Sequence, residues 1–262
     1  MMKDLFSLAG RVAVVTGGSR GIGKMIAQGF VEQGAKVYIT ARKAPACDQT
    51  AEELSKLGAC ISLPHDLATV DGCKAFAADY AQYENSLDIL VNNAGAAWGA
   101  AFEEFPESGW DKTMDLNVKS LFFLTQALFQ PLKKAASAER PAKVINIASI
   151  DGIKINPWET YPYQASKAAV IHLTRRLAAQ LIRDNICVSA IAPGAFASEM
   201  NKAAKDMGDA VAKMVPAGRI GSATDMAGAA VFLASKAGDY VVGDTLAVDG
   251  GVAYSSLGEA WG

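Results

Sequence analysis

Residues 16–23, Thr16-Gly17-Gly18-Ser19-Arg20-Gly21-Ile22-Gly23, form a glycine-rich turn between an apolar run and a segment of helical period. Glycines at such positions let the chain turn sharply from strand to helix, bring the backbone close to a pyrophosphate, and aim helix N–H groups at its negative charge. In this strand–turn–helix setting the turn predicts a dinucleotide-binding unit. The expected cofactor contacts are Gly17, Ser19, Arg20, Gly21 and Ile22.

Beyond this turn, short apolar runs alternate with longer segments of helical period. Because the runs are apolar throughout, both faces of the predicted strands should be buried. Repeated units of this kind predict a single-domain Rossmann fold, an α/β architecture with a doubly wound parallel seven-stranded sheet flanked by helices. The predicted strands are Val12–Thr16, Lys36–Thr40, Cys60–Leu63, Ile89–Asn92, Val144–Ala148, Cys187–Ile191 and Thr245–Val248. The predicted helices are Gly21–Gln33, Pro45–Leu57, Thr69–Tyr83, Gly109–Lys134, Tyr161–Arg183 and Ala223–Ala234.

The alternation is interrupted most clearly between residues 193 and 221, a stretch rich in Met and Ala with a helical patch around 199–214. Long connections after the carboxyl end of a strand are often lids over a binding site. The chain has no linker rich in Pro, Gly or Ser. We therefore expect one domain over residues 1–262, with a substrate lid at about 195–221.

The composition excludes several classes of protein. The 262 residues carry a formal net charge of −2 without a cluster of like charges, so nucleic acid and anionic membranes are not expected partners. No apolar stretch reaches the roughly 18 residues of a membrane span, and the first residues do not resemble a secretory signal, which favours a cytoplasmic protein. The four cysteines lie far apart and should be reduced and packed. With only His65 and His172, neither a zinc site nor a Ser-His-Asp hydrolase can be assembled, and no metal is expected.

The end of the second predicted strand indicates which nicotinamide cofactor is used. Proteins that bind NAD usually carry an acidic residue there to hold the ribose 2′-hydroxyl. This chain has Ala41 at that place, followed by Arg42, and Arg20 lies in the glycine turn. Two guanidinium groups without a carboxylate suit a 2′-phosphate, so NADP(H) is predicted.

Tyr163 and Lys167 are spaced four residues apart within a predicted helix, which places them on one face, one turn apart. A tyrosine of ordinary pKa, about 10, is a poor base at neutral pH. A nearby ammonium group favours the phenolate, so the pKa of Tyr163 is expected to fall and the phenol to exchange protons with a carbonyl oxygen. Tyr161 has Ala165 four residues on and therefore lacks a cationic partner.

Several further motifs occur in one order along the chain, and together they resemble the short-chain dehydrogenase/reductase family of the classical type over nearly the whole length. The turn at 16–23 resembles the TGxxxGxG of that family, residues 92–95 its NNAG, and residues 249–251 its DGG. The resemblance implies cofactor contacts from Asp66, Leu67, Asn93, Ala94, Gly95, Tyr163, Lys167, Pro193, Gly194 and Phe196. The family often has Thr shortly after its PG, whereas this chain has Ala195-Phe196-Ala197-Ser198, leaving Ser198 as the substitute hydroxyl.

The same resemblance implies two more catalytic residues besides Tyr163 and Lys167. Ser149, fourteen residues before Tyr163, matches a serine that polarises the substrate oxygen, an electrostatic role. Asn117 matches an asparagine that holds a water linked to the lysine. The lysine also hydrogen-bonds the nicotinamide ribose in such enzymes. The implied reaction is reduction of a carbonyl to an alcohol.

Within the family the chain most resembles 3-oxoacyl reductases, and its stretches 98–118 and 137–149 are similar to those of the enzymes linked to rhamnolipid synthesis. This implies a 3-oxoacyl substrate carried on acyl carrier protein or coenzyme A, and a homotetramer. Two alternatives stay open: a dehydrogenase or reductase of a small alcohol, sugar or xenobiotic ketone, and a non-catalytic NADP-binding regulator. The expected pocket walls are Ala96–Phe102, Ile150–Trp158 and the lid beginning at Phe196. The candidate residues in them are Trp98, Ile150, Trp158, Phe196, Met200, Met207 and Met214, and candidate contacts to an acidic carrier are Lys154, Lys202 and Lys205.

Overall fold

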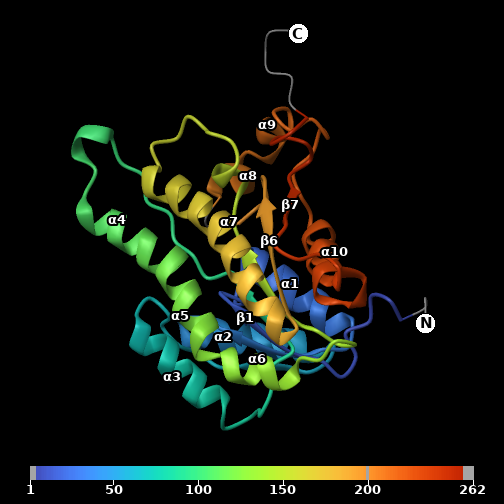
Figure 1. Ribbon diagram of the computed structural model, residues 1–262. Coiled ribbons are helices and arrows are strands. Elements are labelled where there is room, and N and C mark those ends of the chain that lie inside the picture. Colours follow the sequence, from blue (N-terminus) through green and yellow to red (C-terminus); the bar gives the residue numbers. More distant parts are fainter. Residues whose placement is uncertain (1–3, 199–200, 256–262) are drawn as a thin grey trace.

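The computed structural model describes residues 4–198 and 201–255, and within them seven parallel strands form one sheet in the order β3-β2-β1-β4-β5-β6-β7 (Figure 1). The order reverses direction between β1 and β4, which defines a doubly wound Rossmann sheet and confirms the predicted fold class. In such sheets a ligand crevice lies outside the carboxyl ends of the strands at this reversal. The strands are β1 Val12–Thr16, β2 Lys36–Thr40, β3 Cys60–Ser62, β4 Ile89–Asn92, β5 Ala142–Ile147, β6 Ile186–Pro193 and β7 Thr245–Val248.

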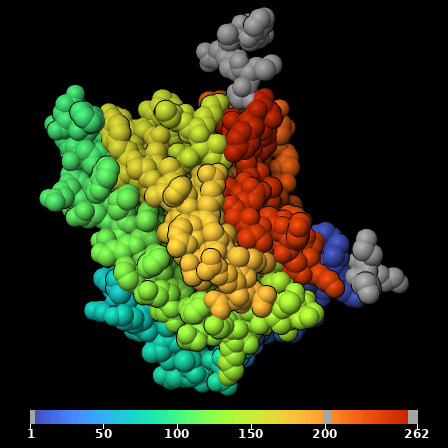
Figure 2. Space-filling model, in the orientation of Figure 1, coloured from blue at the N-terminus to red at the C-terminus, as the bar shows by residue number. Residues whose placement is uncertain are grey.

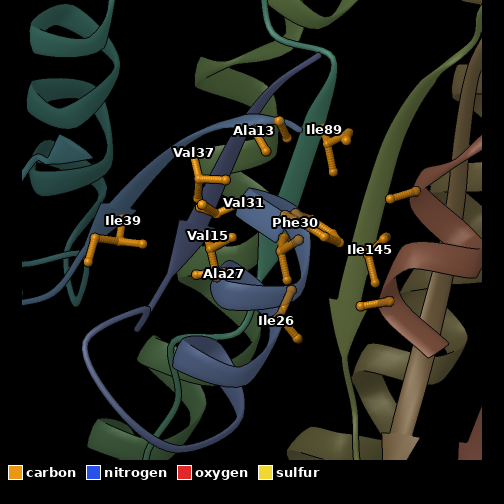
Figure 3. Close-up of a cluster of buried hydrophobic side chains, with 14 of the residues drawn as sticks. Ala13, Val15, Ile26, Ala27, Phe30, Val31, Val37, Ile39, Ile89 and Ile145 are labelled. Carbon is orange, nitrogen blue, oxygen red and sulfur yellow. The ribbon is translucent and has the colours of Figure 1, made fainter. Parts of the chain in front are cut away.

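Helices cover both faces of the sheet, as apolar strands require. One face packs against α1 (Gly21–Glu32), α2 (Ala44–Ser55) and α10 (Ala223–Ala234), whose buried side chains form one core with β1 and β2 (Figure 3). The other face packs against α3, α5, α6 and α7. The remaining helices are α3 Val70–Tyr80, α4 Glu107–Met114, α5 Ser120–Ala127, α6 Phe129–Ala135, α7 Tyr161–Leu181, α8 Lys202–Asp206 and α9 Gly208–Ala212.

The helix predicted over residues 109–134 is largely confirmed: the chain is helical without a gap from α4 through a π-helical segment at Asp115–Lys119 to α5, and a one-residue interruption at Leu128 separates α5 from α6. Pro131 explains this interruption. A proline ring clashes with the carbonyl four residues earlier, which here belongs to Ala127, the final residue of α5. In the first turn of α6 the missing N–H of Pro131 costs no helical hydrogen bond.

Helices α1 and α10 approach each other closely on the first face of the sheet. A Cβ added to Gly29 of α1 would lie 2.7 Å from the Cβ of Ala227 in α10, so the helices can meet at this distance only because residue 29 lacks a side chain. By contrast, the next residue of α10, Gly228, is exposed and has nothing within 4 Å of such an added atom. The glycine at position 29 therefore has a packing function that the one at 228 lacks.

The four cysteines are free and buried, as the sequence predicts. Burial raises the pKa of each thiol, to about 12 for Cys60. No helix in the described ranges is both long enough and apolar enough to cross a membrane.

Candidate active site

The glycine turn has backbone conformations that require glycine. Gly17 and Gly21 have φ values of +64° and +53°, which side chains rarely tolerate. A Cβ on Gly17 would lie 2.8 Å from the side-chain nitrogen of Asn93, and one on Gly23 would collide with the carbonyl oxygen of Gly17. The turn therefore presents bare backbone before the N-terminus of α1, and this cradle fits a pyrophosphate.

Thr16 joins this turn to the loop after β4. Its hydroxyl accepts hydrogen bonds from the backbone N–H groups of Asn93 and Ala94, at 2.9 and 2.8 Å, and donates to the carbonyl of Val91 at 3.2 Å. The Asn93 side chain donates in turn to the carbonyl of Thr16 at 2.8 Å. These bonds fix the two loops at the point where the strand order reverses. Thr16 is not among the predicted site residues, although it begins the glycine motif.

Both candidate arginines lie beyond the carboxyl ends of adjacent strands. Thr16 of β1 is in register with Thr40 of β2, and Arg20 and Arg42 follow within four residues of these ends. Both side chains are exposed, as a contact to a surface phosphate requires. Asp66 is also exposed, and its carboxylate accepts from the N–H of Ala68 at 3.0 Å. Leu67 beside it is buried.

The chain after β6 packs against the chain after β7. Pro193 and Gly194 belong to the first of these segments and Asp249 to the second. The N–H of Gly194 donates to the carbonyl of Val248 at 3.0 Å, and a Cβ at this position would lie 2.7 Å from Cα of Asp249. The Asp249 carboxylate closes the following turn by accepting from the N–H groups of Gly251 and Ala253. Ser198 lies against the glycine turn, since an added Cβ on Gly21 would be 3.3 Å from its own Cβ.

Tyr163, Lys167 and Ser149 lie together where α7 crosses the end of β5. The ammonium nitrogen of Lys167 is 5.5 Å from the centre of the Tyr163 ring and donates to the carbonyl of Ile147 at 2.8 Å. Ser149, two residues after that carbonyl, hydrogen-bonds the Tyr163 side chain. A phenol and a hydroxyl joined in this way can both reach one oxygen atom, which is the arrangement a carbonyl substrate needs.

Burial determines the protonation of the two α7 residues. It raises the pKa of Tyr163 to about 12, because the hydrogen bond with Ser149 offsets only part of the loss of solvation. It also lowers the pKa of Lys167 to about 8. The prediction that Lys167 depresses the pKa of Tyr163 is therefore wrong for the protein alone. At neutral pH the phenol carries its proton, which suits a proton donor.

Asn117 lies in the π-helical segment, and its buried side chain connects two elements. Its amide nitrogen donates to the carbonyl of Ala96 and to the hydroxyl of Ser166, each at 2.9 Å, and its oxygen accepts from the N–H of Ala96 at 2.8 Å. The side chain thus ties the loop after β4 to α7, one residue before Lys167. π-Helical segments often occur at functional sites.

The candidate pocket walls divide into exposed and packed residues. Trp158, Met207 and Met214 are exposed, whereas Trp98 and Ile150 are partly buried. Phe196 is fully packed into the core, with its ring against Gly221, so only its backbone can meet a cofactor and its place as a pocket wall is wrong. Met200 and part of the predicted helical patch at 199–214 lie outside the described residues. The rest of that patch forms the two short helices α8 and α9, and the side chain of Lys202 is likewise not described.

One further charged group, Asp151, is close to this cluster; it falls within the predicted pocket wall Ile150–Trp158 but is not among the residues predicted individually. It is partly buried, and its N–H donates to the Ser149 hydroxyl at 3.1 Å. Its position two residues after Ser149 is the only signal that the sequence offers for it.

Several known proteins are similar to this chain over most of its length. A family model described as enoyl-(acyl carrier protein) reductase matches residues 17–253. The rhamnolipids biosynthesis 3-oxoacyl-(acyl-carrier-protein) reductase of Pseudomonas aeruginosa is 48% identical over 253 residues, which cover 95% of this chain and 99% of that protein. A gluconate 5-dehydrogenase of Gluconobacter oxydans is 38% identical over 260 residues, covering 96% and 98%. Among solved structures, the Pseudomonas aeruginosa RhlG/NADP active-site complex matches with a TM-score of 0.92 and 48% identity, covering 95% of this chain and 98% of that one.

Proposed function

The chain belongs to the short-chain dehydrogenase/reductase family as an NADP-dependent oxidoreductase, and we propose that it reduces the ketone of a 3-oxoacyl thioester to the 3-hydroxyacyl form. The observation that carries the substrate class is the 48% identity, over nearly the full length of both proteins, to a relative named as a 3-oxoacyl reductase. Carbonyl reduction itself is supported by the neutral phenol of Tyr163 beside the hydroxyl of Ser149.

The residues of the cradle fit NADPH. Backbone N–H groups at Ser19 to Ile22 would hold the pyrophosphate, and Arg20 and Arg42 the 2′-phosphate. The loop at Asn93–Gly95 and the backbone at 193–196 would bound the rest of the molecule. When bound, NADPH supplies the hydride that the carbonyl carbon receives.

The proton chemistry belongs to the side chains of this chain. Ser149 donates a hydrogen bond to the substrate oxygen and holds it beside the phenol. Tyr163 gives its proton to that oxygen as negative charge develops there, which completes the alcohol. The ammonium group of Lys167 stabilises the resulting phenolate until solvent returns the proton. Asn117 acts as a positioning residue, because its side chain holds α7 against the loop after β4.

We further propose that residues 195–221 act as a lid over the substrate. The segment starts directly after β6, and Ser198 brings it against the glycine turn. It carries Met207 and Met214, whose side chains are exposed and flexible enough to follow an acyl chain. Coenzyme A or acyl carrier protein would carry that chain, in the cytoplasm, and the active assembly would be a homotetramer.

A second candidate function is the reduction of a sugar acid. The observation that favours it is the 38% identity to a gluconate 5-dehydrogenase over 96% of the chain. The two functions share their residues and differ only in the group attached to the ketone.

A substrate panel with NADPH tests the proposal. Acetoacetyl-coenzyme A and a longer 3-oxoacyl-coenzyme A are compared with 5-ketogluconate, and cofactor consumption is followed by absorbance. We expect kcat/KM for the thioesters to exceed that for the sugar acid by at least about tenfold, the step that about 1.4 kcal/mol of preferential binding gives. A preference for 5-ketogluconate would favour the second candidate. Tight NADPH binding without turnover of any carbonyl would favour a regulatory protein.

A further inference from the structure

The turn that carries Asp151 is held beside the reacting groups by two independent backbone contacts. The N–H of Asp151 donates to the Ser149 hydroxyl at 3.1 Å, within the 3₁₀ turn Ile150–Gly152. That turn packs directly on α7: a Cβ on Gly152 would lie 2.6 Å from the carbonyl carbon of Lys167. The turn therefore cannot move away from the part of α7 that carries Tyr163 and Lys167.

A series of hydrogen bonds through Asn156 holds the Asp151 carboxylate itself. Asp151 is hydrogen-bonded to the side chain of Asn156. The oxygen of Asn156 in turn accepts from the N–H of Trp158 at 2.8 Å and from the side chain of Gln164 at 3.2 Å. The carboxylate is thus part of an ordered wall formed by residues 151–158 and the start of α7.

The charge of Asp151 reaches the catalytic cluster. It acts to raise the pKa of both Tyr163 and Lys167, so all three groups lie within electrostatic range of one another. Lys167 is 95% buried, and its ammonium group donates a hydrogen bond to the carbonyl of Ile147. Asp151 is only partly buried. Burial raises the pKa of Asp151, and the hydrogen bond with Asn156 and the charge of Lys167 act in the opposite direction and favour the carboxylate. A substrate at Tyr163 therefore lies within electrostatic range of this carboxylate.

We propose that Asp151 is a specificity-determining residue that disfavours ketones bearing a carboxylate near the reacting carbonyl. Two like charges in a site of low dielectric repel each other strongly, and a like charge placed beside the charge of the wrong substrate is a general means of rejecting it. A sugar acid has its carboxylate within a few bonds of the ketone. A 3-oxoacyl thioester is neutral there, with its anionic groups far along the carrier. The inference rests on the proposed function and gives a reason why this chain would select thioesters over sugar acids.

The test uses a pair of substrates that differ in charge: acetoacetate and ethyl acetoacetate, each reduced with NADPH. For the unmodified protein we expect kcat/KM to favour the ester by at least about tenfold, and Asp151→Asn to lower this ester-to-acid ratio by about tenfold. A ratio that stays within about twofold of the unmodified value would overturn the proposal. If Asp151→Asn does not fold, as judged by circular dichroism, Asp151→Ser is assayed against the same criterion.

Asn156→Ala is the matched control, because it removes the hydrogen-bond partner of the carboxylate but keeps the charge. Its ester-to-acid ratio should stay near that of the unmodified protein, and an equal shift in both variants would show that wall order, not charge, decides the ratio. Where the small ketones are reduced too slowly, the ratio of their inhibition constants against acetoacetyl-coenzyme A is compared between the variants instead; it reports the same charge effect on binding.

The outcome separates this inference from the proposed function. Turnover of neutral ketones without thioester turnover would reject the proposed function, yet a ratio that depends on Asp151 would still support the inference. Preferential reduction of 5-ketogluconate by the unmodified protein would reject both.

Discussion

Tyr163 is an acid that the fold keeps protonated. Its side chain is partly buried, the hydroxyl of Ser149 is bonded to it, and loss of solvation raises its pKa to about 12. The sequence identifies the residue through its spacing from Lys167, but spacing says nothing about solvation. The direction of the pKa shift therefore could not be foreseen.

Tyr163→Phe should lower kcat by about 10²- to 10⁴-fold, the usual contribution of a positioned acid, because the ring remains while its proton is lost. NADPH affinity, measured by fluorescence titration, should change little. Tyr161→Phe is the control, since that side chain is exposed and contacts the rings of Phe102 and Phe105 instead. Near-normal turnover in Tyr163→Phe would refute the assignment of the acid.

The rate of reduction should fall as the pH rises through about 8. Burial lowers the pKa of Lys167 to about 8, so this side chain is mainly an ammonium group below that pH and mainly a neutral amine above it. Tyr163, with a pKa of about 12, stays protonated over the whole range. The measurement is kcat/KM between pH 6 and 10. Lys167→Arg should move this decline to higher pH, because guanidinium stays charged above about pH 12. A flat profile would contradict a role for the ammonium charge.

Arg42→Asp should weaken the binding of NADPH much more than the binding of NADH, and the ratio of the two affinities should change by at least about tenfold. The reason is that the new carboxylate repels a 2′-phosphate but accepts a hydrogen bond from a 2′-hydroxyl. Kd values for both cofactors from titration check this. Lys43→Ala, one residue further on, serves as a control for a general loss of positive charge. An unchanged cofactor ratio in Arg42→Asp would remove this residue from the site.

At the scale of elements, strands were the more predictable part of the molecule. Each predicted strand occurs within a few residues, because an apolar run bounded by turn residues is a local signal. The helix predicted at 109–134 has two irregularities, a π-helical segment and an interruption at Leu128, which the continuous apolar period does not show. Pro131 is a local cause, but the π-helical segment around Asn117 accompanies bonds to Ala96 and Ser166, which are 21 and 49 residues away.

The crossing of α1 and α10 gives a prediction at this scale. Gly29→Ala should lower the free energy of unfolding by about 1–3 kcal/mol, because its new methyl group must push the two helices apart. Gly228→Ala should instead raise it by about 0.5–1 kcal/mol, since alanine favours the helix and nothing lies within 4 Å. Thermal denaturation of both variants compares them directly. Equal effects would mean that the crossing is not limited by residue 29.

At the scale of the whole molecule, the order of the strands explains how distant motifs form one site. The glycine turn, the loop at 92–95, Ser149 and Pro193 together span more than 170 residues of the chain, yet each lies at or just after the carboxyl end of a parallel strand. The sequence predicts this convergence because parallel strands end at one edge. It does not single out Asp151 within the predicted wall at 150–158, because the role proposed for this residue depends on how the turn after β5 packs against α7.

The proposed homotetramer is also a property at this scale. Figure 2 shows a face on which α4 and α5 (green) lie beside α7 (yellow to orange). Near it, Phe102, Trp110 and Tyr161 leave substantial aromatic surface exposed. Burying such a surface favours association. Light scattering should give a mass four times that of the 27.4-kDa chain, and a mass that remains monomeric at micromolar concentration would reject the assembly.

The four buried cysteines allow local opening of the protein to be measured by chemical labelling. Because all four thiols are inaccessible and burial raises their pKa, a maleimide can react only after the surrounding layer opens. Cys47 and Cys60 lie in or beside the layer of α2 and β3, Cys73 in α3 and Cys187 in β6. Counting the labels added over time by mass spectrometry would therefore show which layer of the protein separates first on heating, without any introduced probe.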